Sequence, residues 1–209
     1  ALRNSFGKAV ARLEAKGLSH SSCLSNPYGA VKSLKLKTYL VFALLEQGTV
    51  IRSIGDYVLR RVNEEDIPSV VSVNLVTLPE HYSDFFYYEL LRNFPEGFIV
   101  AERRGKIVGY IMCRIEYGFS FFKFSIARKG HIVSIAVLAE HRRKGLGEAM
   151  MLEAMEAMKK RGCEEAFLEV RVSNHPAISL YKKLGFKEVR RIPFYYRDGE
   201  EALVMAKPL

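Results

Sequence analysis

The sequence predicts a mixed α/β domain in which helices flank a central, twisted sheet of mixed strand direction. Three observations support this fold class. Apolar segments of strand length alternate with helix-forming segments from about residue 57 to the end of the 209-residue chain. The apolar run 132–138 leads through a basic, glycine-containing turn into a helix-forming segment. The composition, 49% apolar and 26% charged, is typical of a globular protein.

One strand and two helices are expected at the start of this domain. The strand covers residues 57–62. Asn63 can cap the helix that follows, and the acidic residues directly after it suit the positive end of the helix dipole. Pro79 ends this helix near residue 77. Ser83 and Asp84 can cap a second helix, which continues to residue 94.

The remainder of the domain is expected to alternate strands and helices. Gly105 lies in a three-residue turn between two strands, which is a hairpin signal. A helix over residues 145–161 is rich in strong helix formers and ends at Gly162. Asn174 can cap the last helix. The further elements are strands at 98–102, 106–116, 131–138 and 166–172, a helix at 175–184, and a closing hairpin of 186–192 and 202–206.

Residues 1–55 are predicted to form a basic N-terminal extension, and residues 56–209 the main domain. Residues 1–56 carry 8 Lys and Arg against 3 Asp and Glu, which accounts for about half of the net charge of +9. The main domain is close to balanced, so we expect no specific DNA binding. Within the extension we expect a helix at 6–18, a loop at 19–29 and a helix or strand at 34–45.

The composition also limits membrane, metal and redox chemistry. No apolar run approaches the length that spans a bilayer, and no signal-peptide pattern opens the sequence. Cys23, Cys113 and Cys163 are odd in number and widely spaced, so they form no metal-ligand pair and indicate reduced thiols. We therefore expect a cytoplasmic protein that binds no membrane and no metal.

The turn after the apolar run 132–138 is the most informative motif. It has the sequence Arg142-Arg143-Lys144-Gly145-Leu146-Gly147 and opens a helix. Unpaired backbone N–H groups at a helix start bind anions with the help of the helix dipole, and glycine permits a close approach. The turn lacks the Gly-Lys-Ser/Thr of a P-loop and the first two glycines of a Rossmann turn. It therefore predicts a phosphate-binding turn of another kind.

This Arg-x-x-Gly-x-Gly turn resembles the pyrophosphate loop of the GNAT-family N-acetyltransferases. Four further segments narrow the resemblance to the catalytic subunit of the protein N-terminal alpha-acetyltransferases, especially archaeal members, with a bacterial ribosomal-protein N-acetyltransferase as a more distant relative. The resemblance covers about three-quarters of the chain and implies the GNAT acyl-CoA N-acyltransferase fold, with acetyl-CoA as co-substrate. The four segments are LPEHY at 78–82, GHIVSIAV at 130–137, LEVRVSN at 168–174 followed by 177–186, and YYRDGEEA at 195–202.

The resemblance implies an activity, the transfer of acetyl from acetyl-CoA to the α-amino group of a protein N-terminus. In the family, the loop equivalent to residues 78–82 and a pair of tyrosines flank the peptide. His81 stands where asparagine is frequent among relatives. The implied peptide-binding residues are Leu78, Pro79, Glu80, Tyr82, Tyr195 and Tyr196.

The acetyl-CoA site is expected along the strand 131–138 and the basic turn. This strand should diverge from its neighbour, so that its backbone can pair with pantetheine and polarise the acetyl carbonyl. The resemblance places Asn174 on the pantetheine arm and makes Tyr181 the general acid for the departing thiolate, although Tyr181 also suits helix packing. The expected cofactor-binding residues are Ile135, Ala136, Val137, Arg142, Arg143, Lys144, Gly145, Leu146, Gly147, Asn174 and Tyr181.

Three residues are candidates for accepting the proton of the amine, whose pKa of about 8 leaves it largely protonated near neutral pH. His131 titrates in a suitable range but equally suits an inert, hydrogen-bonded strand end. Glu169 lies in an apolar strand and needs a partner, for which Arg171 on the same strand face is one candidate. Glu80 could orient or deprotonate the amine, or be solvated. The resemblance suggests that His131 and Glu169 act together through ordered water.

Two other functions stay open. A GNAT enzyme that acts on lysine side chains or small amines would share the basic turn, although the paired tyrosines argue modestly against it. The basic extension could attach the protein to ribosomes, although a solvated surface explains the same charge. Neither Cys113 nor Cys163 lies in a nucleophile motif, so we expect direct attack in a ternary complex rather than an acyl-enzyme.

Overall fold

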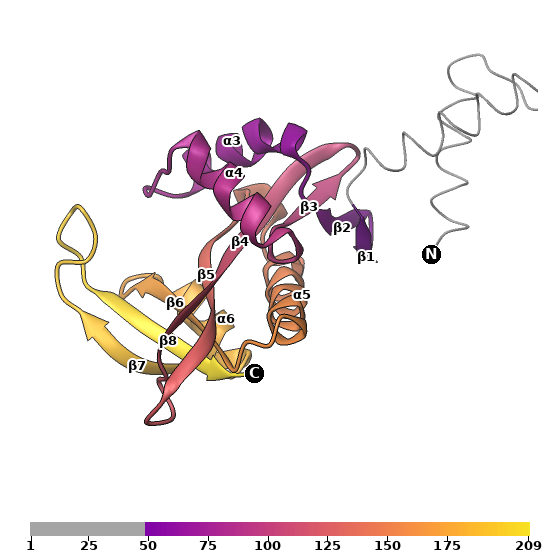
Figure 1. The fold of residues 1–209 in the computed structure, drawn as a ribbon. Helices are drawn as coiled ribbons and strands as arrows, with labels where there is room; N and C mark the ends of the chain where they lie inside the picture. Colours follow the sequence, from indigo (N-terminus) through magenta and orange to yellow (C-terminus); the bar gives the residue numbers. More distant parts are fainter. Residues whose placement is uncertain (1–48) are drawn as a thin grey trace, which may run out of the picture. The chain divides into compact units, whose positions relative to one another are not determined.

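The computed structural model describes residues 49–209 and contains a mixed eight-stranded sheet (Figure 1). The strand order is β1-β2-β3-β4-β5-β6-β8-β7, in which β5 and β6 are parallel and all other neighbours are antiparallel. The predicted fold class is therefore confirmed. The elements expected at 6–18, 19–29 and 34–45 lie outside the described residues. The strands are β1 Val50–Ile54, β2 Tyr57–Arg61, β3 Ile99–Arg103, β4 Lys106–Phe119, β5 Ile126–Val137, β6 Glu165–Arg171, β7 Lys187–Ile192 and β8 Ala202–Pro208.

The helices cover both faces of the sheet. Figure 1 shows α3 and α4 together, apart from α5 and α6. Strand side chains alternate between the faces, so that Tyr110 and Met112 of β4 pack with α3 and α4, whereas Ile111 and Cys113 pack with α5 and α6. The helices are α3 Ile67–Thr77, α4 Asp84–Asn93, α5 Leu146–Lys160 and α6 His175–Lys183, with 3-10 turns η1 Glu64–Asp66, η2 Pro95–Gly97 and η3 Ala139–His141.

Two of the predicted helix caps are present, and one is not. The backbone N–H of Asn63 donates to Asp66 in a capping box, which opens the 3-10 turn η1 before α3. The side chain of Asn174 accepts from the N–H of Ala177 and caps α6. Ser83 occupies the N-cap position of α4, but its side chain makes no capping hydrogen bond.

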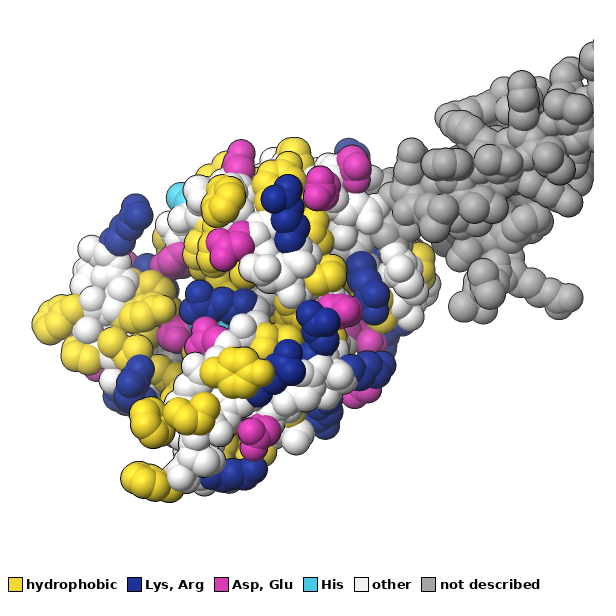
Figure 2. All heavy atoms as spheres, viewed as in Figure 1, with side chains coloured by type: hydrophobic (Ala, Val, Ile, Leu, Met, Phe, Trp, Pro, Cys, Tyr) yellow, Lys and Arg dark blue, Asp and Glu magenta, His cyan; other side chains and the backbone are white. Residues whose placement is uncertain are grey.

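Two features of the sheet were not predicted. The edge strand β1 lies in the segment that the sequence assigned to the extension, and β4 and β5 continue beyond the expected 106–116 and 131–138 into a long hairpin. The run Tyr-Gly-Phe-Ser-Phe-Phe-Lys-Phe-Ser at 117–125 supplies the aromatic residues of this hairpin end. Figure 2 shows hydrophobic side chains gathered there, at the lower left of the domain. The buried Glu165 of β6 fastens the hairpin by accepting from Ser120 Oγ and the N–H of Phe121.

Gly130 brings α5 close to β5. A Cβ at this position would meet the side chain of Met158, which is fully buried in α5. Because no side chain separates the two elements here, the helix that follows the basic turn packs directly on the strand that carries His131.

Candidate active site

Strands β5 and β6 separate halfway along their length. They pair only from Lys129↔Glu165 to His131↔Phe167, whereas β5 continues to Val137 and β6 turns to β8 for its further partners. Alternate N–H and C=O groups of residues 132–137 therefore face β6 without a strand partner. The predicted divergence is confirmed, and within Ile135, Ala136 and Val137 it leaves the backbone groups that face away from β4 without a strand partner, although the carbonyl of Val137 accepts from the Arg142 side chain.

The basic turn opens α5 as expected. Gly145 is the N-cap residue with a left-handed φ of 78°, and Arg143 has a φ of 60°. The first N–H groups of α5, including that of Gly147, have no partner within the helix. The side chain of Leu146 is buried, so that only its backbone faces the turn.

Two basic side chains of the turn are held by the protein. Arg142 Nε donates to the carbonyl of Val137 at 2.9 Å, which ties the turn to the end of β5. Lys144 Nζ donates to Tyr57 Oη at 3.0 Å and to the carbonyl of Glu140 at 3.1 Å. The turn therefore combines a fixed backbone with a high local positive charge.

His131 and Glu169 meet where β5 and β6 begin to separate. His131 Nε2 lies 2.7 Å from Glu169 Oε2, and the imidazole stacks on Phe167 with ring centroids 4.4 Å apart. The structure brings the two predicted residues together from strands 38 positions apart. Glu169 therefore pairs with His131, and the alternative pairing with Arg171 is wrong, because Arg171 binds other carboxylates.

Arg114 of β4 determines the tautomer of His131. Its Nε donates to His131 Nδ1 at 3.1 Å, and it also pairs with Glu116 at 3.0 Å. An arginine N–H can only donate, so Nδ1 accepts and Nε2 carries the proton that is donated to Glu169. No motif in the sequence indicated this contact between Arg114 and His131.

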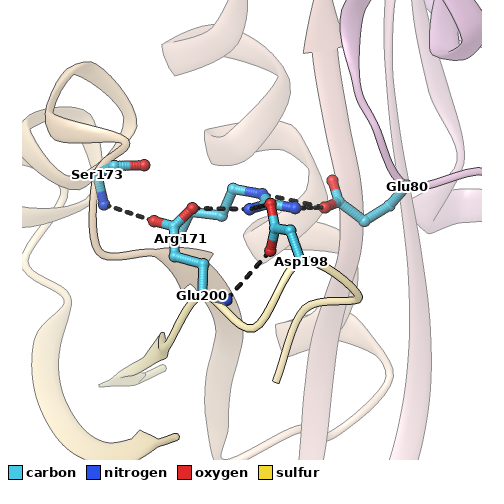
Figure 3. Close-up of polar contacts among 5 residues, drawn as sticks. All are labelled: Glu80, Arg171, Ser173, Asp198 and Glu200. Atoms are coloured by element: carbon cyan, nitrogen blue, oxygen red, sulfur yellow. Dashed lines mark hydrogen bonds and ion pairs between the residues drawn. The ribbon is translucent and has the colours of Figure 1, made fainter. Parts of the chain in front are cut away.

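Arg171, at the end of β6, joins three segments of the chain (Figure 3). Its Nη2 donates to Glu80 Oε1 at 2.6 Å, and its Nη1 donates to Asp198 and Glu200 at 2.7 Å each. Figure 3 shows Glu80 on one side of the guanidinium and the other two carboxylates opposite. Tyr196 lies beneath it, with its ring centroid 4.0 Å from Arg171 Cζ.

Two of the carboxylates around Arg171, Asp198 and Glu200, have lowered pKa values. Hydrogen bonds from the N–H of Glu200 and then from Arg171 hold the pKa of Asp198 below its usual range. Those from Ser173 and then Arg171 do the same to the pKa of Glu200. The role of this cluster was missed in the sequence, although the segment 195–202 contains two of its members.

Four of the predicted peptide-binding residues, Glu80, Tyr82, Tyr195 and Tyr196, lie around this cluster, whereas Leu78 packs against the apolar core beneath α3 and α4. Glu80 presents Oε1 to Arg171, while its Oε2 has no partner among the described residues. Tyr82 Oη donates to the carbonyl of Val133 at 3.4 Å, and Tyr195 packs edge-to-face on Tyr196. Burial, followed by neighbouring Tyr110 and Glu80, raises the pKa of Tyr82 to about 12, so its hydroxyl is a neutral donor. The loop 78–82 and the tyrosine pair thus come together, as the resemblance implied.

Tyr181 and Asn174 lie on α6 and at its start. Tyr181 is buried, and its ring contacts that of Phe186 at a centroid distance of 6.1 Å. Burial raises its pKa, which keeps the phenol protonated. Asn174 uses its Oδ1 to cap α6, so that only its Nδ2 remains for other partners.

Two absences apply to residues 49–209. They contain no cluster of three His, Cys, Asp or Glu side chains that could hold a metal ion. None of their helices is both long and apolar enough to cross a membrane.

Comparison with known proteins identifies the family. Residues 66–186 match the acetyltransferase (GNAT) family. The chain belongs to the GNAT acetyltransferases. The N-alpha-acetyltransferase of Sulfurisphaera tokodaii is 50% identical to it over 157 residues, which cover 74% of this chain and 94% of that protein. The N-alpha-acetyltransferase of Saccharolobus solfataricus is 49% identical with the same coverage.

Solved structures agree with this placement of the acetyltransferase. Ard1 from Thermoplasma volcanium superposes with a TM-score of 0.65 at 30% identity, covering 74% of this chain and 98% of that one. Naa50 from Arabidopsis thaliana, in complex with the bisubstrate analogue CoA-Ac-MVNAL, gives 0.65 at 27% identity and covers 74% and 99%. The acetyltransferase therefore has the GNAT fold that the sequence predicted.

Proposed function

We propose that this acetyltransferase transfers acetyl from acetyl-CoA to the α-amino group of protein N-termini by direct attack. The observation that carries the proposal is one arrangement: the free edge of β5 lies between the turn that opens α5 at one end and the residues Glu80, His131 and Glu169 at the other. Relatives of about 50% identity named N-alpha-acetyltransferases support the same reaction.

The residues present fit acetyl-CoA. Along Ile135, Ala136 and Val137, the backbone N–H and C=O groups that face away from β4 offer donors and acceptors to the amides of pantetheine, apart from the Val137 carbonyl that Arg142 holds. The first N–H groups of α5, with Gly145 and Arg143, offer an anion site to pyrophosphate. When bound, acetyl-CoA supplies an activated thioester, and the N–H groups at the β5 edge would stabilise negative charge on its carbonyl oxygen.

The peptide would enter between the loop 78–82 and the pair Tyr195 and Tyr196. Glu80 Oε2 has no partner among the described residues and can accept a hydrogen bond from the α-ammonium group. Neutral tyrosine hydroxyls can hydrogen-bond the peptide backbone without adding charge. A free N-terminus is recognised as a cation followed by a peptide backbone, which distinguishes it from a lysine side chain.

Proton removal falls to Glu169 with His131. The carboxylate is fixed by the Nε2 proton of His131 and can accept a proton from the amine through water. Arg114 holds the imidazole in that tautomer. Tyr181 is protonated and would donate to the departing thiolate.

The test is acetylation of matched peptides. The protein is incubated with acetyl-CoA and peptides that begin with Ser, Ala, Met-Leu or Met-Glu, each with a free or a formylated α-amine and each containing an internal lysine. Mass spectrometry of fragments locates the acetyl group. We expect it on the free α-amine; acetylation of the lysine in both peptide forms would overturn the proposal and favour the lysine alternative.

Two further proposals concern where the enzyme works. We infer ribosome association through the basic extension 1–55, and a cytoplasmic location, from the charge and composition of the sequence. Co-sedimentation with ribosomes should fall steeply with salt and be lost when residues 1–48 are deleted. Salt-independent co-sedimentation would contradict ribosome association through the basic extension.

A further inference from the structure

A line of polar side chains runs through the core from the loop 78–82 to strand β5. His81 Nδ1 lies 3.1 Å from Asn74 Oδ1, Asn74 Nδ2 donates to Tyr110 Oη at 2.9 Å, and Tyr110 Oη lies 2.8 Å from Ser134 Oγ. Asn74, Tyr110 and Ser134 are all buried, so these groups depend on one another for hydrogen bonds. The line crosses from the loop through α3 and β4 to β5.

The direction of donation along this line follows from its members. The Oδ1 of Asn74 can only accept, so His81 Nδ1 carries a proton and donates it. Tyr110 accepts from Asn74 and can direct its own proton to Ser134. Each group between the two ends thus both receives and gives a hydrogen bond, and the removal of one leaves its neighbours unsatisfied in the core.

Both ends of the line lie at the proposed site. His81 stands between Glu80, which is bound to Arg171, and Tyr82, whose hydroxyl reaches Val133. Ser134 directly follows Val133, the extra residue of a bulge in the β4–β5 pairing, and lies within the part of β5 that has no partner in β6. The contact with Asn74 is the only side-chain hydrogen bond of His81 within residues 49–209, and the line connects the loop to the strand that would carry the acetyl group.

We propose that His81 is a positioning residue for the peptide, which acts through Asn74, Tyr110 and Ser134 to hold the loop 78–82 against the sheet. This inference rests on the proposed N-terminal acetylation. It predicts that breaking the line loosens the loop and weakens binding of the peptide. Binding of acetyl-CoA, which the β5 backbone would hold, should change little. A purely structural role would instead lower stability without a preference between the two substrates.

The core offers a matched pair of substitutions. Tyr110 and Tyr87 are both fully buried in the same cluster, but the hydroxyl of Tyr87 has no hydrogen-bond partner among the described residues. Tyr110→Phe removes the hydrogen bonds to both Asn74 and Ser134, and it should raise the peptide KM about 3- to 10-fold with the acetyl-CoA KM within about two-fold. Tyr87→Phe should leave both KM values within about two-fold.

A double-mutant cycle tests whether His81 acts through the line. The peptide KM of His81→Leu with Tyr110→Phe should equal that of the stronger single variant, whereas the effects of His81→Leu and Tyr87→Phe should multiply. Amide exchange of residues 78–82 should speed up in Tyr110→Phe and not in Tyr87→Phe. These results together would support the proposal.

Three outcomes would overturn it: an unchanged peptide KM in Tyr110→Phe, equal changes in both KM values, or independent effects of His81→Leu and Tyr110→Phe. Thermal unfolding of each variant shows that it is folded. If the unmodified enzyme acetylates no N-terminus, the proposed function itself fails. If it does and these variants behave like it, only the role of His81 fails.

Discussion

The proton on His131 is placed by its neighbours. Arg114 donates to Nδ1, which leaves the Nε2 proton for Glu169. A neutral imidazole in this tautomer donates to the carboxylate rather than competing with it for the proton of the amine. At the level of single residues, the arrangement therefore favours Glu169 as the acceptor and His131 as the group that orients it.

Glu169→Gln tests this assignment. Glutamine keeps an oxygen that can accept from His131 Nε2 but cannot take a proton, so kcat should fall about 100- to 1,000-fold with both KM values nearly unchanged. Steady-state kinetics with peptide and acetyl-CoA measure this. Glu116→Gln is the control, because Glu116 pairs with Arg114 in the same neighbourhood but lies 3.8 Å from His131. A loss of less than about three-fold in Glu169→Gln would contradict the assignment.

The buried hydroxyl of Tyr82 makes the free energy of unfolding depend on pH in the alkaline range. Burial raises its pKa from about 10 in the unfolded chain to about 12 in the folded protein. A raised folded-state pKa contributes stability that is fully present below pH 10 and is lost as the pH rises through 12. Urea midpoints should therefore fall less between pH 9 and pH 11 in Tyr82→Phe than in the unmodified protein. Tyr117→Phe is the control, because Tyr117 is exposed. Its urea midpoint should fall between pH 9 and pH 11 by the same amount as that of the unmodified protein.

At the level of elements, one side chain connects the two walls of the proposed peptide site. Arg171 extends β6, and its guanidinium bridges the loop after α3 and the loop between β7 and β8. A planar group with five donors can bond carboxylates on opposite sides at once, which an ammonium group cannot do with the same geometry. The distance between the two walls is thus set by the length of one guanidinium.

Arg171→Lys should separate these walls. The charge is kept but the bridge is lost, so we expect the peptide KM to rise about 10-fold or more with the acetyl-CoA KM within about two-fold. Arg191→Lys is matched to it, because Arg191 also pairs with two carboxylates, Glu188 and Glu201, on the exposed side of β7 and β8. Equal kinetics for the two variants would show that Arg171 does not position the peptide.

Gly145→Val tests the phosphate-binding turn. Gly145 has a φ of 78°, and no atom lies within 4 Å of a Cβ built there, so the substitution acts through the backbone rather than through a clash. We expect the Kd for acetyl-CoA to rise about 10-fold or more by calorimetry. Gly55→Val has the same left-handed geometry and the same open surroundings in the β1–β2 turn. It should lose comparable stability but bind acetyl-CoA normally; unchanged affinity in Gly145→Val would refute the site.

At the level of the whole molecule, the sequence predicted those features that depend on residues close together in the chain. The element order and the caps at Asn63 and Asn174 follow from residue types within a few positions, whereas the divergence of β5 was expected from the family resemblance. The edge strand β1 was missed because Val-Ile-Arg-Ser-Ile has no clear alternation of buried and exposed residues. The Arg171 cluster could not be predicted, since Glu80 and Arg171 are 91 positions apart and meet only through the sheet.

The polar line from His81 to Ser134 likewise joins residues that are far apart in the chain. The sequence identified His81 as a departure from the related proteins, but its partners come from α3, β4 and β5. The pairing of β4 with β5 creates this contact, because Tyr110 pairs with Ala136 and thereby lies diagonally across from Ser134, which pairs with Met112. Charge and motif therefore located the site, and the register of the sheet supplied the contacts that hold it.

The spacing between α5 and β5 is the property of the whole fold that the site depends on most directly, because α5 begins at the basic turn and β5 carries His131. Gly130→Ala should widen it, since the added Cβ meets Met158, and we expect a loss of about 1–3 kcal/mol in the free energy of unfolding by urea titration. Gly118→Ala is the control in the same hairpin, where only the flexible end of Lys129 lies close, at 3.3 Å. Combining Gly130→Ala with Met158→Ala should destabilise less than the sum of the two single changes, because the space vacated by methionine accepts the new methyl group. Additive losses would show that the glycine does not set the distance between helix and strand.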